Sequence, residues 1–270
     1  MRRTLIITLL SLAVAATLQA HQGLHEQIAA VTARIRQQPR NGALYLKRAE
    51  LYRLHHEWRL AARDYERARR YDPALDPVDL GKGTMLLERG RAAEALFPLR
   101  RYVRSAPDDA RGHLSLGRAY AALGRTPEAI DELTLAVRYT PDPDPDLILE
   151  RVHVLAAANR RDEALRTLDE VLATRGPLIA LQLAAIDLEV QSRDYEAALR
   201  RVDEAEASSP RKESWLARRG EILLRAGRPM EARAAYQAAL DAIAELPPER
   251  RGTRAMRDLQ EKLRRALATD

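Results

Sequence analysis

The sequence predicts an all-α chain of about six helix–turn–helix repeats, each about 34 residues long, between two capping helices. The first observation is a small residue that recurs with spacings of 34, 34, 35, 34 and 34 residues: Ala61, Ala95, Ala129, Ala164, Ala198 and Ala232. The second is a large side chain four residues after each alanine: Tyr65, Leu99, Leu133, Leu168, Val202 and Tyr236. The third is an aromatic content of only 4%, which suits closely packed helices rich in Ala and Leu.

Helix packing explains this pattern. A small residue lets the two helices of a repeat touch, and a large residue one turn later fills the gap to the next repeat. Proline ends the second helix because it cannot continue the helical hydrogen bonds. The closing residues keep the same step along the chain: Pro73, Pro107, Pro141, Gly176 and Pro210.

Residues 1–20 predict a secretory signal peptide. Arg2 and Arg3 precede an apolar run from Leu5 to Ala16, and small residues follow it. Cleavage after Ala15, Ala16 or Ala20 is compatible with this pattern. The alternative is an uncleaved membrane anchor, although the run is shorter than the roughly 20 apolar residues of a spanning helix. The mature chain contains no other membrane-length segment. We therefore expect a periplasmic or secreted bacterial protein.

Residues 21–41 predict an N-terminal capping helix. Leu24, Ile28, Val31 and Ile35 form one apolar stripe, and the helix ends before Pro39 and the Asn41–Gly42 pair. This stripe can cover the open end of the first repeat.

The six repeats then occupy residues 42–75, 76–109, 110–144, 145–178, 179–212 and 213–246. The small residue of each first helix is Ala49, Gly83, Gly117, Val152, Ile186 or Gly220, so the fourth and fifth repeats depart from the pattern. In the fifth repeat Ala185 with Leu188 is an equally good register. The one extra residue lies in the alternating Pro–Asp run 141–146 and predicts a longer inter-repeat loop.

Residues 247–270 predict a C-terminal capping helix. Met256, Leu259, Leu263 and Leu267 lie on one stripe of a helix from Glu249 to Leu267, as the open end of a repeat array requires. The alternative is a basic helix that docks on acidic partners or anionic lipid, because arginines surround the stripe.

Residues 110–141 resemble the tetratricopeptide repeat (TPR), a 34-residue helix–turn–helix unit with the pattern W-x2-L-G-x2-Y…A-x3-F…P. Leu116, Gly117 and Tyr120 match its first helix. Ala129 and Leu133 match its second helix, and Pro141 matches its exit. The resemblance covers roughly residues 42–246. It implies a right-handed α-solenoid and a function in holding another protein or peptide.

The resemblance also implies where a ligand binds, because TPR solenoids use the concave groove lined by their first helices. The residue after each small residue points there, together with neighbours one turn later. The predicted groove residues are Glu50, Arg53, Thr84, Arg118, His153, Asp187, Glu221 and Arg225, with Glu88 beside them. The Lys–Asn set with which some family members clamp a C-terminal carboxylate is not present. A polar peptide or protein surface is the expected ligand, and a groove that is only solvated is the alternative.

Other binding chemistry has weaker support. If cleavage follows Ala20, His21 begins the mature chain, and its amine and ring could bind copper with help from His25. This periplasmic copper-handling function is the alternative to the scaffold. His113 is predicted to be packed, His55 and His56 to lie at a turn, and the Gly81–Thr84 run to be helical rather than a phosphate loop.

Composition excludes several function classes. The chain has no cysteine, so thiol catalysis and disulfides are excluded. The net charge of +6 is spread over helices in which Arg alternates with Asp and Glu, which makes nucleic-acid binding unlikely. No catalytic triad, zinc motif or carboxylate pair stands outside the repeats. We therefore expect a non-catalytic scaffold without a cofactor.

Overall fold

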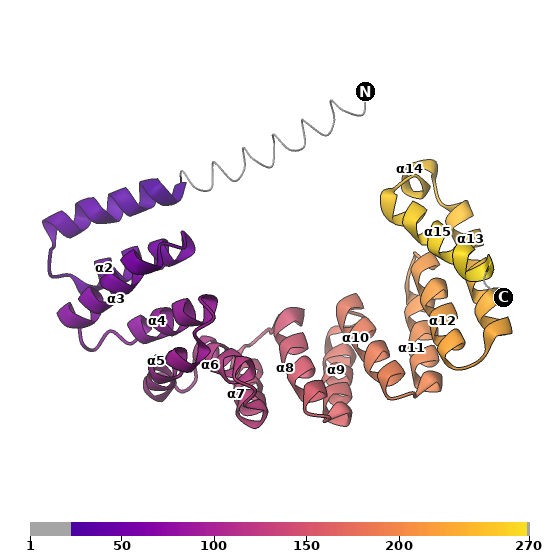
Figure 1. Cartoon of the computed structure of the whole chain (residues 1–270), viewed down its shortest axis with the longest axis horizontal. Coiled ribbons are helices and arrows are strands. Elements are labelled where there is room, and N and C mark those ends of the chain that lie inside the picture. Colours follow the sequence, from indigo (N-terminus) through magenta and orange to yellow (C-terminus); the bar gives the residue numbers. More distant parts are fainter. Residues whose placement is uncertain (1–22, 269–270) are drawn as a thin grey trace. The chain divides into compact units, whose positions relative to one another are not determined.

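The computed structural model describes residues 23–268, and helices with no strand make up its regular structure (Figure 1). The chain divides between Asp142 and Pro143 into two compact units. This division falls in the Pro–Asp run, where the sequence predicts the longer loop. We describe each unit by itself.

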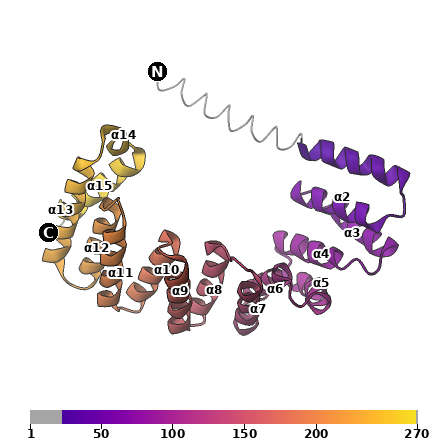
Figure 2. The ribbon, with the colours of Figure 1, turned by 180° about the vertical axis from the view of Figure 1, so that it is seen from behind.

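The N-terminal unit contains a helix over residues 23–37 followed by three helical hairpins. The hairpins are α2 (Gly42–Leu54) with α3 (Trp58–Tyr71), α4 (Pro77–Glu88) with α5 (Ala92–Ser105), and α6 (Ala110–Ala122) with α7 (Thr126–Tyr139). Successive hairpins pack side by side, and the first helices α2, α4 and α6 contact one another in turn. This arrangement creates one face made only of first helices, and both views of the ribbon show the hairpins in series (Figures 1 and 2).

The C-terminal unit repeats this construction. Its hairpins are α8 (Pro145–Ala157) with α9 (Arg161–Arg175), α10 (Ile179–Gln191) with α11 (Tyr195–Ser208), and α12 (Glu213–Arg225) with α13 (Pro229–Glu245). Each second helix also packs on the first helix of the next hairpin within the unit. In the fifth repeat Ala185 and Ile186 are both buried, so the residues of both predicted registers face the core.

The alanines that define the repeat spacing are buried in all six second helices, and so are the large residues four positions later. The glycines show what the large residues pack against. A Cβ on Gly83 would lie 2.5 Å from Leu99 Cγ, and one on Gly220 would lie 2.3 Å from Tyr236 Cε1. These large side chains therefore press on the first helix of their own repeat. The prediction that they only fill the gap to the next repeat is incomplete.

The turn inside each hairpin uses a residue with positive φ at one constant register position. Three of these residues are glycines, for which this conformation carries no steric cost. The other three are His56, Asn159 and Arg193, with φ between 58° and 61°. His55 and His56 lie at such a turn, as the sequence predicts.

The N-terminal helix covers the first hairpin through its apolar stripe. Val31 and Ile35 are buried, and Leu24 and Ile28 are half-buried. Thr32 Oγ1 accepts a hydrogen bond from Arg48 Nη1 at 3.1 Å. The predicted role of this helix as a cap is in keeping with these contacts.

The predicted C-terminal cap is two helices rather than one. Helix α14 (Pro248–Arg251) stops at Gly252, and α15 (Arg254–Ala268) follows it. Helix α15 packs against α13. Met256 and Leu263 are buried in the core cluster, and Leu259 and Leu267 pack against it. The predicted stripe is therefore correct, whereas the single continuous helix is not.

No helix within residues 23–268 combines the length and the apolar character needed to cross a bilayer. The predicted signal peptide and His21 lie outside the described residues.

Candidate functional site

The predicted groove residues all lie on first helices. Glu50 and Arg53 are on α2, Thr84 is on α4, Arg118 is on α6, His153 is on α8, Asp187 is on α10, and Glu221 and Arg225 are on α12. None of them is buried. We call the surface that they share within each unit the first-helix face.

In the N-terminal unit this face carries a network of charged side chains. Arg53 Nε donates to Glu50 Oε2 at 2.9 Å, and Arg53 Nη1 donates to Glu88 on α4. Tyr65 of α3 donates its hydroxyl to Glu50 Oε1 at 2.6 Å. Burial opposes the charge on Arg53, but the neighbouring carboxylates outweigh it and raise the pKa of the guanidinium. Glu50 and Arg53 therefore join two repeats to each other.

Gly81 of α4 allows this network to form. A Cβ at this position would lie 2.1 Å from Glu50 Oε1 and 2.7 Å from Tyr65 Cε1. Helix α4 can approach the carboxylate this closely only because residue 81 has no side chain. The Gly81–Thr84 run is thus part of a helix packed against α2 and α3, in agreement with the helical rather than phosphate-loop prediction.

In the C-terminal unit two predicted residues belong to a second network. Arg218 of α12 forms ion pairs with Asp187 of α10 and, at 2.9 Å, with Glu221. Lys262 of α15 also binds Glu221. Burial opposes ionisation of Glu221, but Lys262 and Arg218 outweigh it and hold the pKa of the carboxyl below its ordinary value.

Sequence analysis did not identify Arg218 or Lys262. Arg218 lies three residues before Glu221, which is a recognisable helical pairing distance. Lys262 is 41 residues from its partner, and no short-range signal predicts that contact. By contrast, the exposed side chains of His153 and Arg225 form no ion pair or hydrogen bond within residues 23–268. The side chains of these two residues on the first-helix face are therefore available to a partner.

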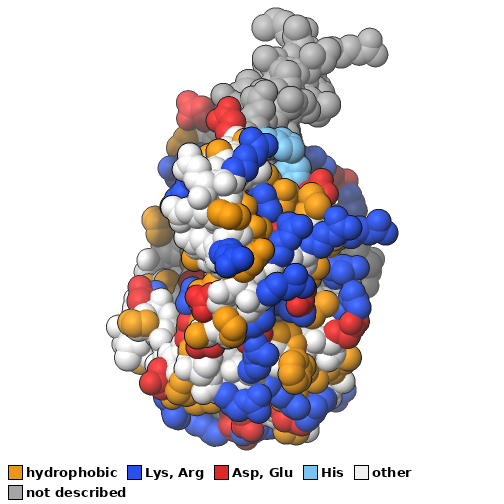
Figure 3. Space-filling view, turned by 90° about the vertical axis from the view of Figure 1, so that its left-hand side faces the viewer, with side chains coloured by type: hydrophobic (Ala, Val, Ile, Leu, Met, Phe, Trp, Pro, Cys, Tyr) orange, Lys and Arg blue, Asp and Glu red, His pale blue; other side chains and the backbone are white. Residues whose placement is uncertain are grey.

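The histidines do not assemble a metal site within residues 23–268, where no group of three His, Cys, Asp or Glu side chains could hold an ion. The rings of His25 and His55 lie 4.5 Å apart. Figure 3 shows histidine side chains together near the top of the described surface. His113 is buried as predicted, with its ring nitrogens 2.7 Å from Glu132 Oε2 and from the carbonyl oxygen of Pro107. The copper hypothesis depends on His21, outside the described residues.

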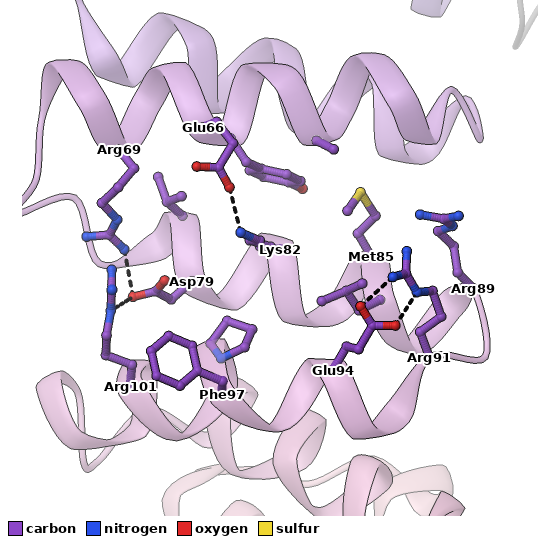
Figure 4. Close-up of a pocket in the computed structure, with 15 residues that line it drawn as sticks. Glu66, Arg69, Asp79, Lys82, Met85, Arg89, Arg91, Glu94, Phe97 and Arg101 are labelled. Atoms are coloured by element: carbon purple, nitrogen blue, oxygen red, sulfur yellow. Dashed lines mark hydrogen bonds and ion pairs between the residues drawn. The ribbon is translucent and has the colours of Figure 1, made fainter.

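A pocket that sequence analysis missed lies among α3, α4 and α5 (Figure 4), and Thr84 is not among the residues that line it. Its volume is about 610 Å³. We call it the Phe97 pocket, because Phe97 lies at its edge and is 71% exposed. Its apolar lining is formed by Ala62, Tyr65, Val78, Met85, Leu86 and Pro98.

Charged side chains bound the Phe97 pocket. At one end Asp79 Oδ2 lies 2.6 Å from both Arg69 Nη2 and Arg101 Nε. Across the middle Lys82 Nζ contacts Glu66 Oε1 at 2.5 Å. The remaining charged residues, Arg89, Arg91 and Glu94, lie near Met85 at the other end (Figure 4). The pocket is therefore an apolar cleft between α3 and α5 with a predominantly basic border.

Comparisons with known proteins agree with this architecture. A family profile for a tetratricopeptide repeat matches residues 46–109 and 80–146, and one for a tetratricopeptide repeat-like domain matches residues 173–259. Together they cover more than half of the chain. No protein with a curated description matches it.

Several solved structures share the fold. A TPR protein from Parabacteroides merdae is 15% identical with a TM-score of 0.54, over 89% of this chain and 92% of that one. PilW, described as a type IV pilus biogenesis factor, is 18% identical with a TM-score of 0.58, over 75% and 95%. YrrB, described as a TPR protein with an unusual peptide-binding site, is 13% identical with a TM-score of 0.50, over 74% and 97%. At such identities the likeness concerns the fold alone, and it confirms the predicted helical-repeat solenoid.

Proposed function

The chain belongs to the tetratricopeptide repeat family, and from this premise we propose that it is an exported, non-catalytic scaffold that binds a protein or peptide segment. TPR repeats support a protein-interaction scaffold in general. The finer proposal is that the segment binds in a groove formed by the first helices.

One observation carries this proposal most directly. Within the N-terminal unit α2, α4 and α6 contact one another in turn, and in the C-terminal unit α8 contacts α10 and Arg218 of α12 pairs with Asp187 of α10. These first helices present polar, unburied residues at one register position. A partner lying across them can reach one residue per repeat, including Thr84 and Arg118 in the N-terminal unit and His153 in the C-terminal unit. YrrB, a TPR protein described as having a peptide-binding site, supports a peptide as one kind of ligand.

The ion-pair networks assign different roles to the predicted residues. Glu50, Arg53 and Glu221 are held by neighbours within the fold, so they shape the face and fix the spacing of the helices. A polar surface held in place by such pairs loses little conformational freedom when a partner binds. We propose that the partner contacts Thr84, His153 and Arg225, together with Arg118, which is exposed on α6.

Affinity capture from the native host tests the groove. The full chain and its Arg118→Ala variant serve as baits, with Arg63→Ala as the matched control on a second helix, because Arg63 is exposed and unpaired within residues 23–268. We expect a discrete protein that the parent and the control retain and that Arg118→Ala retains about fivefold less. Equal capture by all three baits, or no discrete protein at all, would contradict the groove.

Export is tested separately. Alkaline phosphatase, active only outside the cytoplasm, is fused after residue 41, with and without residues 1–20. We expect activity only when residues 1–20 are present. Activity that does not depend on residues 1–20 would remove export from the proposal without affecting the scaffold.

A further inference from the structure

We propose that the Phe97 pocket is a second docking site for a protein segment that carries a bulky apolar side chain flanked by carboxylates. The site is distinct from the first-helix face. Val78, Lys82 and Met85 line it from α4, at helical spacings of four and three residues, and Arg89 lines it from the turn that follows α4. Thr84 lies on another side of the same helix.

The apolar part of the site is unusual for an exposed surface. Phe97 is the single phenylalanine of the chain and is 71% exposed. It lines the cleft together with Val78, Met85 and Pro98. Aromatic side chains at the edge of an apolar cleft are typical anchors of protein interfaces, because a partner can bury them completely. An apolar side chain of the partner, seated between Phe97 and Met85, would do so.

Pro98 explains why the pocket lies in the second repeat. One repeat earlier the corresponding residue is Asp64, which accepts hydrogen bonds from Arg48 Nε at 2.5 Å and Arg48 Nη2 at 3.0 Å. Lys82 corresponds to Arg48, but Pro98 offers it no acceptor. Lys82 binds Glu66 on the preceding helix instead, at 2.5 Å. The middle of the α5 side, at Phe97 and Pro98, is therefore apolar.

The charge balance of the border selects the partner. The lining contains five cations (Arg69, Lys82, Arg89, Arg91 and Arg101) and three carboxylates (Glu66, Asp79 and Glu94). Two arginines share the single carboxylate of Asp79. The guanidinium of Arg89 makes no ion pair or hydrogen bond within residues 23–268. A partner with carboxylates on either side of its apolar residue supplies the missing negative charge.

Selection from a phage-displayed library of random 12-residue peptides tests the site, with the purified full chain as bait and Phe97→Ser as the counter-selection bait. We expect enriched peptides that place Asp or Glu within three positions of a Leu, Ile, Met or aromatic residue. A synthetic copy of such a peptide should bind Phe97→Ser at least about tenfold more weakly, a loss of about 1.4 kcal/mol.

Charge reversal makes the test specific. Arg89→Glu should lower the affinity for the acidic peptide and, in a fresh selection, enrich peptides with Lys or Arg beside the apolar residue. Arg200→Glu is the matched control, because Arg200 is exposed on α11, outside the pocket, and unpaired within residues 23–268. It should bind as the parent does. All three variants change exposed residues, so their melting temperatures should equal that of the parent.

Three results would overturn the proposal. The first is that no peptide is enriched over the Phe97→Ser bait. The second is enrichment of peptides that lack the acidic–apolar pattern. The third is equal affinity of the selected peptide for the parent, Phe97→Ser and Arg89→Glu. None of these results bears on the groove, since Arg118 lies outside the pocket.

Discussion

Replacing Gly83 with alanine should destabilise the N-terminal unit, and the same change should stabilise it once Leu99 has been shortened. Leu99 is completely buried, and its Cγ and Cδ2 atoms lie 2.5 Å from the position of a Cβ on Gly83. Ordinary contacts begin near 3.4 Å, so Leu99 has to move by about 1 Å into a packed core. Such overpacking costs about 1–3 kcal/mol.

A second effect opposes this cost. Alanine is favoured over glycine inside a helix by about 1 kcal/mol. We therefore expect Gly83→Ala alone to lower the free energy of unfolding by up to about 2 kcal/mol. Leu99→Ala alone should cost about 2–5 kcal/mol, because it leaves a cavity. In the Leu99→Ala background the clash is gone, and Gly83→Ala should raise the free energy of unfolding by about 1 kcal/mol.

The chain offers a way to observe one unit alone, because one of its two tryptophans lies in each unit. In a Trp215→Phe background, the fluorescence of Trp58 follows urea unfolding of the N-terminal unit in all four proteins of the double-mutant cycle. The predicted result is a change of sign between the two backgrounds. Stabilisation by Gly83→Ala in both backgrounds would refute the close packing of α4 against α5.

The remaining predictions concern other positions. Ala129 is completely buried, so Ala129→Arg should lower the stability measured in a thermal melt by several kcal/mol. Arg118→Ala, at an exposed site, should change the stability by no more than about 0.5 kcal/mol. An unchanged melt for Ala129→Arg, or a large loss of stability for Arg118→Ala, would show that the repeat register is wrong. Arg193 has a φ of 61°, so Arg193→Gly should stabilise the C-terminal unit by up to about 1 kcal/mol in urea unfolding, and destabilisation would count against a left-handed turn there. Lys262 and Arg218 lower the pKa of Glu221, so the stabilisation by this carboxylate is fully present above the ordinary carboxyl pKa and is lost as pH falls through the lowered value. The difference in free energy of unfolding between the parent and Glu221→Gln should therefore shrink below about pH 4.5. A difference independent of pH would contradict the pairing.

The helical pairs could be predicted from the sequence because the signals that specify them are local. The alanine spacing, the large residue four positions later and the closing prolines all act within one hairpin. The C-terminal cap shows the limit of this reasoning. The apolar stripe through Met256 and Leu263 predicts the buried face, but Gly252 ends α14 before α15 begins.

The charged networks depend on distances between helices, and the sequence alone does not contain those distances. Arg53 and Glu88 are 35 residues apart, and they meet because α2 and α4 pack side by side. Periodicity places both residues on the first-helix face, but it does not show that their charges are paired. The sequence therefore predicts which face is polar, whereas the structure shows which polar residues form ion pairs with other helices.

The Phe97 pocket was missed for a related reason. Three helices from two repeats enclose it, and repeat alignment treats residue 97 as an ordinary exposed position. A signal was nevertheless present, since the only phenylalanine of the chain precedes a proline in the middle of a predicted helix. Proline inside a helix removes a backbone donor and is rare without a structural reason. The sequence does not show that Lys82, without an acceptor at Pro98, pairs with Glu66 of α3, because that contact depends on how α3 packs against α4.

The most direct test of the scaffold is site-specific photo-crosslinking in the native host. A photoreactive residue replaces Arg118 on the first-helix face and, in a parallel strain, Arg63 on the second helix α3. The scaffold account predicts one discrete protein crosslinked from position 118 and absent from position 63, identified by mass spectrometry. The same products from both positions, or no product from position 118, would contradict binding at the first-helix face.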